Sequence, residues 1–125
     1  MSPAAQQLVA VYEEWRRETL SEASAISLGD WTEVSVIQSR KVLLRQRIES
    51  GALAGVAGSL TGDDELLVRA FVSELIRLEL SNDSALESKR REANEEMSLI
   101  DSAAGNLRRV QRYAQPTESA WAAYS

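Results

Sequence analysis

Groups of neighbouring carboxylates are the residues of this chain whose spacing could support acid–base chemistry or metal binding. Glu92 stands three and four residues before Glu95 and Glu96, so on a helix the three share one face. Asp63 and Asp64 form a second group. Carboxylate metal sites in helical bundles usually add Glu-x-x-His pairs, and the chain contains no histidine. We therefore interpret both groups as solvated helix surface and predict no metal site.

Other residue types that carry catalysis are absent or lack the partners that the chemistry needs. Without histidine there is no imidazole base, and without cysteine there is neither a thiol nucleophile nor a thiolate ligand. No serine lies in a Gly-x-Ser-x-Gly turn. The glycines of residues 51–62 do not continue into Gly-Lys-Ser/Thr, the signature of a phosphate-binding loop. We predict that the protein is not an enzyme and needs no cofactor.

Composition restricts the classes of partner and compartment. The net charge of −5 argues against nucleic-acid binding, because phosphate contacts require a basic face. No apolar run reaches 18 residues, and the first residues lack the basic and apolar regions of a secretory signal. The absence of cysteine requires no oxidising compartment. We expect a cytoplasmic protein with no membrane insertion and no nucleic-acid partner.

The residues predict an all-α fold. Ala, Leu, Glu and Arg are abundant and only two prolines occur, which favours helix over sheet. Ser2 followed by Pro3 is typical of a helix start, and we expect the first helix at residues 3–27. Along that helix, apolar residues recur at steps of three and four and form one stripe, and we assign Glu22 to the opposite, polar side. The stripe consists of Leu8, Tyr12, Trp15, Thr19, Ala23 and Ile26.

A short junction separates the first helix from the second. Gly29 is placed to end one helix in a left-handed conformation, and Asp30 is placed to cap the next, at residues 30–50. A junction this short predicts an antiparallel pair or a sharp bend. The apolar stripe of the second helix is interrupted only by Lys41, whose ammonium we expect to reach water while its stem lies along the seam.

The third helix is expected to be much longer. Four of the six glycines lie in residues 51–62, which we interpret as the main connection, with a loose turn near 52–56. No Gly or Pro occurs from 63 to 104, and the helix is predicted at 63–115. Its apolar residues repeat every ~3.6–3.7 residues, whereas a strict heptad meets polar residues such as Asn82. The predicted architecture is an extended antiparallel helical hairpin or three-helix arrangement with one long C-terminal helix. One domain covers residues 1–116, and an aromatic-containing tail covers 117–125.

An apolar groove is expected to remain, because two or three helices cannot bury all of these stripes. Such a groove could hold an amphipathic helix of another protein, or it could form a homodimer. Core packing is the alternative role for the aromatic residues of the first helix. The candidate partner-binding residues are Tyr12, Trp15, Leu86, Met97, Ile100, Leu107, Tyr113 and Trp121.

The order of these features resembles the FliT/FlgN type of flagellar export chaperone, over nearly all of residues 5–114. In the first two helices, the resemblance is carried by Leu8-x-x-x-Tyr12-Glu-Glu-Trp15, Ala25-Ile-Ser-Leu-Gly-Asp30-Trp31-x-x-Val34 and Gln38-x-x-Lys41. The long helix adds Leu75-Ile-Arg-Leu78-Glu-Leu-Ser-Asn82-x-x-Ala85-Leu86, Lys89-Arg-Arg-Glu92 and Asn106-Leu-Arg-Arg-Val-Gln-Arg-Tyr113.

This resemblance implies an ATP-independent cytosolic chaperone. It would bind the terminal helical segment of an axial flagellar protein, the filament cap or a hook–filament junction protein, and deliver it to the export apparatus. The resemblance assigns Tyr113 to docking at the export gate and makes the tail with Trp121 and Tyr124 a candidate cover for the groove. The alternative from a different class is a structural coiled-coil or adaptor protein that homodimerises through its apolar stripes.

Overall fold

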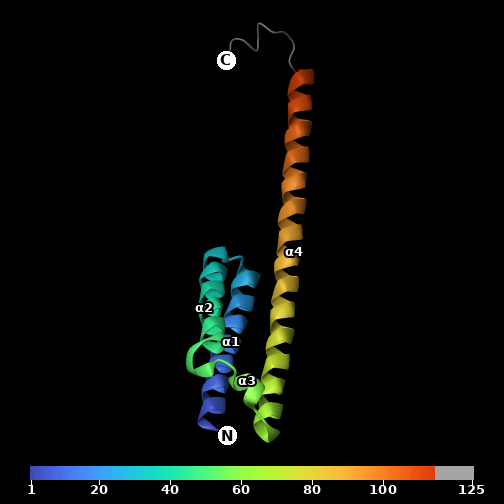
Figure 1. Cartoon of the computed structure of the whole chain (residues 1–125). Helices are drawn as coiled ribbons and strands as arrows, with labels where there is room; N and C mark the ends of the chain where they lie inside the picture. The colour runs from blue at the N-terminus through green and yellow to red at the C-terminus, as the bar shows by residue number, and fades with distance from the viewer. Residues whose placement is uncertain (115–125) are drawn as a thin grey trace. The chain divides into compact units, whose positions relative to one another are not determined.

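The computed structural model of the chain describes residues 1–114, which contain helices and no strand (Figure 1). The all-α fold with one long C-terminal helix is therefore confirmed. Helix α1 spans Pro3–Leu28, α2 spans Trp31–Glu49, and α4 spans Gly62–Ala114. Each of these bounds lies within one residue of its prediction. The tail at 117–125, with Trp121 and Tyr124, lies outside the described residues.

The chain consists of two structural units, and the boundary between them lies within α4. The first is Met1–Lys89, and the second begins at Arg90. This boundary falls inside the span 1–116 that we expected to form one domain. No helix in the described part of the chain is both long enough and apolar enough to cross a membrane.

Local capping determines where α1 and α2 begin and end. The Ser2 hydroxyl accepts a hydrogen bond from the Ala5 N–H at 3.2 Å, which satisfies one of the free donors of the first turn. Gly29 has φ +69°, the left-handed conformation that ends α1. The Asp30 carboxylate accepts from the Glu33 N–H at 3.2 Å and caps α2. The predicted start of the first helix at Ser2 and the predicted junction at Gly29 and Asp30 are confirmed.

The apolar core of the first unit consists of two clusters. In the larger cluster, α1 and α2 contribute Leu8, Val9, Val11, Tyr12 and Leu44, and the later segments contribute Leu53, Val68 and Leu75. The smaller cluster lies near the α1–α2 junction and consists of Ala25, Ile26, Val34 and Ile37, with half-buried Ala85 and Leu86 of α4 packed against it. Figure 1 shows α1 and α2 running antiparallel, as expected.

The connection between α2 and α4 is more ordered than one loose turn. It forms a 3₁₀ turn at Gly51–Leu53 and the short helix α3 at Val56–Ser59. Leu53 is buried, and Val56 and Leu60 pack against the larger cluster, so the connection closes that end of the core. Apolar side chains between the glycines therefore give this segment its structure.

Within the first unit, the buried residues of α4 repeat every seven positions. Val68, Leu75 and Asn82 are all buried and stand seven residues apart. Asn82 had argued against a heptad repeat because it is polar, but it is only 4% exposed. That objection was wrong, since hydrogen bonds allow the amide to occupy a core position.

Candidate functional site

An apolar groove lies between α2 and α4, with residues of α1 as its floor. Its volume is about 330 Å³. Tyr12 and Trp15 of α1 contribute aromatic rings, and Ile48 is the apolar residue from α2. The α4 wall consists of Val72, Leu75, Ile76, Glu79 and Leu80. Arg45 and Glu49 complete the lining on α2, where their charged groups lie 3.9 Å apart. The groove therefore offers apolar surface with charged groups at its edge.

A second, more polar hollow of about 200 Å³ continues from the groove. The two hollows share Trp15, Arg45 and Glu79. The second adds Gln38, Lys41 and Val42 from α2, Asp83 and Leu86 from α4, and Glu22 from α1. As the α2 numbers fall from 49 to 38, the α4 numbers rise from 72 to 86, so the two walls run antiparallel.

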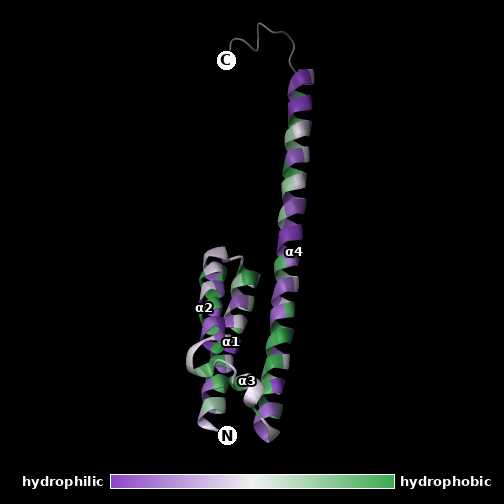
Figure 2. Cartoon of the chain, viewed as in Figure 1, coloured by the Kyte–Doolittle hydropathy of each residue, from purple (hydrophilic) through white to green (hydrophobic). Residues whose placement is uncertain are grey.

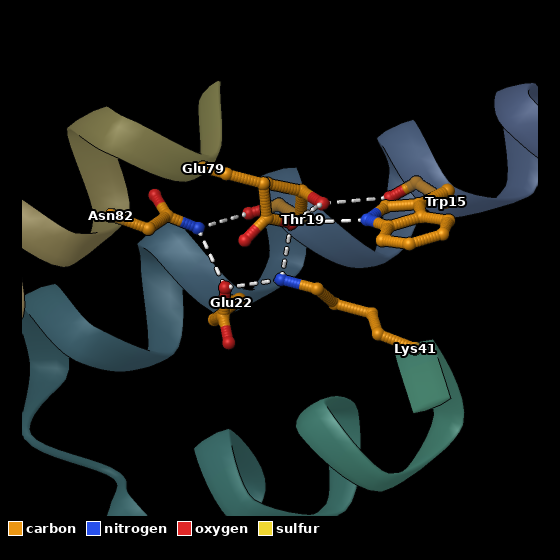
Figure 3. Close-up of polar contacts among 6 residues, drawn as sticks. All are labelled: Trp15, Thr19, Glu22, Lys41, Glu79 and Asn82. Atoms are coloured by element: carbon orange, nitrogen blue, oxygen red, sulfur yellow. Dashed lines mark hydrogen bonds and ion pairs between the residues drawn. The ribbon is translucent and has the colours of Figure 1, made fainter. Parts of the chain in front are cut away.

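A layer of polar residues separates the two apolar clusters of the first unit. Figure 3 shows that six side chains meet there from three helices. Trp15, Thr19 and Glu22 come from α1, Lys41 comes from α2, and Glu79 and Asn82 come from α4. The layer thus lies between the larger and smaller clusters along each helix. Among the described residues, no buried side-chain nitrogen or oxygen lacks a hydrogen-bond partner.

Lys41 is the central cation of this layer. Its ammonium lies 2.8 Å from Glu22 Oε1 and 2.5 Å from Glu79 Oε1, so one charge joins all three helices. Lys41 is 8% exposed and Glu22 is 2% exposed. The predictions that the Lys41 ammonium reaches water and that Glu22 lies on the polar side of α1 were both wrong. A buried ion pair is compatible with folding here because each charge has further polar partners.

The uncharged side chains of this layer provide further hydrogen-bond donors to the carboxylates of Glu22 and Glu79. Asn82 Nδ2 donates to Glu22 Oε1 at 2.8 Å and to the Thr19 carbonyl oxygen at 2.9 Å. Trp15 Nε1 donates to Glu79 Oε1 at 3.0 Å, and the Thr19 hydroxyl lies 3.0 Å from the same oxygen. Because the donors and acceptors must align, this layer sets the register of α4 against the α1–α2 hairpin.

The pKa of Glu79 is held below its ordinary value. Burial by itself would raise the pKa of this carboxyl. The hydrogen bonds from Lys41, Trp15 and Thr19, together with the positive charge of Lys41, outweigh burial and lower the pKa. Burial also raises the pKa of the Tyr12 phenol.

The lowered pKa of Glu79 predicts acid-sensitive stability. A depressed carboxyl pKa contributes stability that is present above the unfolded value of about 4.5 and is lost as pH falls through the folded value. Glu79→Gln keeps an oxygen acceptor but does not titrate. We expect the stability difference between wild type and variant, measured by urea unfolding, to shrink as pH falls below about 4.5. A difference that stays constant from neutral to acidic pH would contradict this prediction.

The structure places the predicted partner-binding residues in three settings. Tyr12 and Trp15 line the groove, and Leu86 lies in the adjoining hollow while also packing on the smaller cluster. In the second unit, the candidate residues are exposed: Met97, Ile100, Leu107 and Tyr113. Trp121 lies outside the described residues. The groove therefore brings together the two aromatics of α1, which also contact the core.

Two sets of site residues were not predicted. Val72, Ile76 and Leu80 form an apolar wall, and their sequence signal is that residues 71–80 are apolar over more than one stripe. The ionic layer was also missed, although its signal was present. A lysine within the apolar stripe of α2 and an asparagine at a heptad position both indicate buried polar contacts. Among residues 1–114, no group of three or more acidic side chains is arranged to hold a metal ion.

The described helices thus form an apolar groove next to a buried ionic layer. Comparisons with models of known protein families, with curated proteins and with solved structures find no match to this chain.

Proposed function

We propose that this protein is a flagellar export chaperone that holds a helix of its cargo in the groove between α2 and α4. The observation that carries the proposal is the groove, whose floor is aromatic and whose walls include exposed apolar side chains of α4. The cargo class follows from the resemblance of residues 5–114 to the FliT/FlgN type. It is the terminal helical segment of an axial protein, the filament cap or a hook–filament junction protein.

The form of the groove favours a helix as the bound element. Its two walls are antiparallel helices, and a further helix lying between them would complete a four-helix arrangement. An amphipathic helix would place apolar residues at i, i+3 or i+4, and i+7 against the apolar end. Polar residues one or two turns further along would meet Lys41, Arg45 and Asp83 in the second hollow.

Charge restricts the cargo helix further. Residues 1–89 contain fourteen acidic and nine basic residues, so this unit carries the whole net charge of −5. A strongly acidic helix would be repelled by this unit, whereas a basic amphipathic helix would be attracted. The negative charge of this unit therefore predicts a preference for basic over acidic cargo helices, which can be measured with cargo peptides of altered charge.

Delivery to the export apparatus is the second part of the proposed function. The resemblance assigns that contact to Tyr113, whose side chain is 91% exposed. Tyr113 lies in the second unit, and the groove lies in the first. Cargo binding and export docking would therefore use different residues, and each can be removed separately by substitution.

Leu80→Asp should weaken cargo binding about 30- to 100-fold without unfolding the protein. The substitution places a carboxylate against the apolar wall, which costs about 2–3 kcal/mol on binding. Leu80 is 63% exposed in the free protein, so little core packing is lost. Binding would be followed by the fluorescence of Trp15 in a background in which Trp31 and Trp121 are replaced by Phe.

Leu43→Asp is the matched control, because Leu43 is 60% exposed and is not part of either hollow. The ligands would be the axial proteins of the source organism, identified by co-purification and then shortened to their terminal helices. Equal affinity of the two aspartate variants for a cargo helix would contradict binding in the groove. Absence of any bound axial protein would contradict the flagellar assignment.

A further inference from the structure

The second unit presents an apolar surface of its own. No residue from 90 to 113 is buried, and Ala104 and Gly105 are the only ones that are half-buried. The exposed large apolar side chains in this range are Met97, Leu99, Ile100, Leu107, Val110 and Tyr113. Figure 2 shows hydrophobic residues recurring among hydrophilic ones along this part of α4. Most helices gain their stability from packing an apolar face, so we expect this surface to pack against a partner.

Met97, Ile100 and Leu107 from this set have the spacing of a coiled-coil seam. Ala93, Ile100 and Leu107 stand seven residues apart, and Met97 and Ala104 fall between them. Steps of four and three residues that alternate in this way keep one stripe facing a neighbouring helix. The stripe covers about two heptads of continuous helix.

After Arg90 and Arg91, the charges of the same segment are separated into two blocks. Residues 92–101 contain four acidic residues and no basic residue, whereas residues 102–113 contain three arginines and no acidic residue. The acidic block consists of Glu92, Glu95, Glu96 and Asp101, and the basic block consists of Arg108, Arg109 and Arg112. A parallel pair of identical helices would place each block beside its own kind, and an antiparallel pair would place each beside its opposite.

We infer that two copies of this protein pair antiparallel through residues 90–113, with the two-fold axis near Ser102. In this register Met97 of one copy lies opposite Leu107 of the other, and Ile100 lies opposite Ala104. The two layers nearest the axis each combine one large side chain, Ile100, with one small side chain, Ala104, which allows the helices to approach closely. The acidic block of each copy lies beside the basic block of the other, and the helix dipoles oppose one another.

The charge pattern favours a second copy of the chain as the partner of this segment, because the segment is complementary to itself when its direction is reversed. The same patch then serves both partners, as in an isologous two-fold interface. The pairing uses none of the groove residues, which all precede residue 90. The inference is therefore independent of the proposed function and can be tested with the purified protein alone.

Crosslinking with engineered cysteines tests both the pairing and its direction, because the chain has no cysteine of its own. The full-length variants Met97→Cys and Leu107→Cys would be prepared separately, mixed and oxidised. Residues that share a core layer can approach closely enough for a disulfide. We expect disulfide-linked dimers mainly between the two different variants. Links of Met97→Cys to itself would overturn the antiparallel direction, and absence of any link would overturn the pairing.

Sedimentation of the unmodified chain gives a second test. We expect a dimer whose dissociation constant rises about 100-fold or more in Ile100→Asn/Leu107→Asn, with helix content near that of wild type. Reversal of the basic block in Arg108→Glu/Arg109→Glu/Arg112→Glu should dissociate the dimer at low salt. Added salt should restore association in this variant, because screening removes the repulsion while the apolar seam remains. A monomeric wild-type chain, or a reversed variant that dimerises as well as wild type at low salt, would overturn the inference.

Discussion

Lys41→Met should lower the free energy of unfolding by about 3–5 kcal/mol, the largest effect we expect from a single substitution. Methionine preserves the stem of the side chain and removes the ammonium. Glu22 is then left as a buried charge with Asn82 as its remaining donor, and Glu79 loses its closest partner. Urea unfolding at neutral pH, followed by circular dichroism, measures the loss.

Two variants show whether the effect comes from the buried charge. Arg40→Met, at the neighbouring position, removes an exposed cation 3.3 Å from Glu18 and should cost no more than about 1 kcal/mol. Adding Glu22→Gln to Lys41→Met should recover part of the loss, because the glutamine can still accept from Asn82 without a buried charge. Equal losses for Lys41→Met and Arg40→Met would show that the ionic layer does not stabilise the fold.

Ile37→Ala should lower the free energy of unfolding by about 2–5 kcal/mol. Ile37 is fully buried in the smaller cluster, where side chains of α1 and α4 surround it. Removing its outer carbons leaves a cavity in addition to the lost burial of apolar surface. Thermal and urea unfolding of the purified variant would measure the effect.

Ile76→Ala makes the same chemical change at a position that is 55% exposed. We expect a change in stability within about 0.5 kcal/mol, together with weaker binding of a cargo helix, since Ile76 lines the groove. The two variants should therefore separate folding from binding. Comparable loss of stability in both would mean that the α4 wall belongs to the core and leaves no groove to fill.

Local sequence determined the helices of this protein. Ser2 predicted where α1 begins, and Gly29 and Asp30 predicted where α1 ends and α2 begins, because capping depends on residues within one turn of the helix end. The stripe of α1 likewise predicted burial of Leu8, Tyr12 and Ile26, since helical periodicity alone decides which residues share a face. These predictions needed no knowledge of the neighbouring helices.

Tertiary structure decided which polar residues are buried and where a groove remains. Lys41 was predicted to reach water but is buried, because Glu22 and Glu79 converge on it from two other helices. Asn82 follows the same principle, as its donors find acceptors on α1. Burial of a charge depends on partners that lie 19 and 38 residues away along the chain, and the groove depends on the spacing of α2 and α4. The periodicity of a single helix determines neither which residues of other helices meet a buried charge nor how far apart α2 and α4 lie. Both features therefore required the assembled fold.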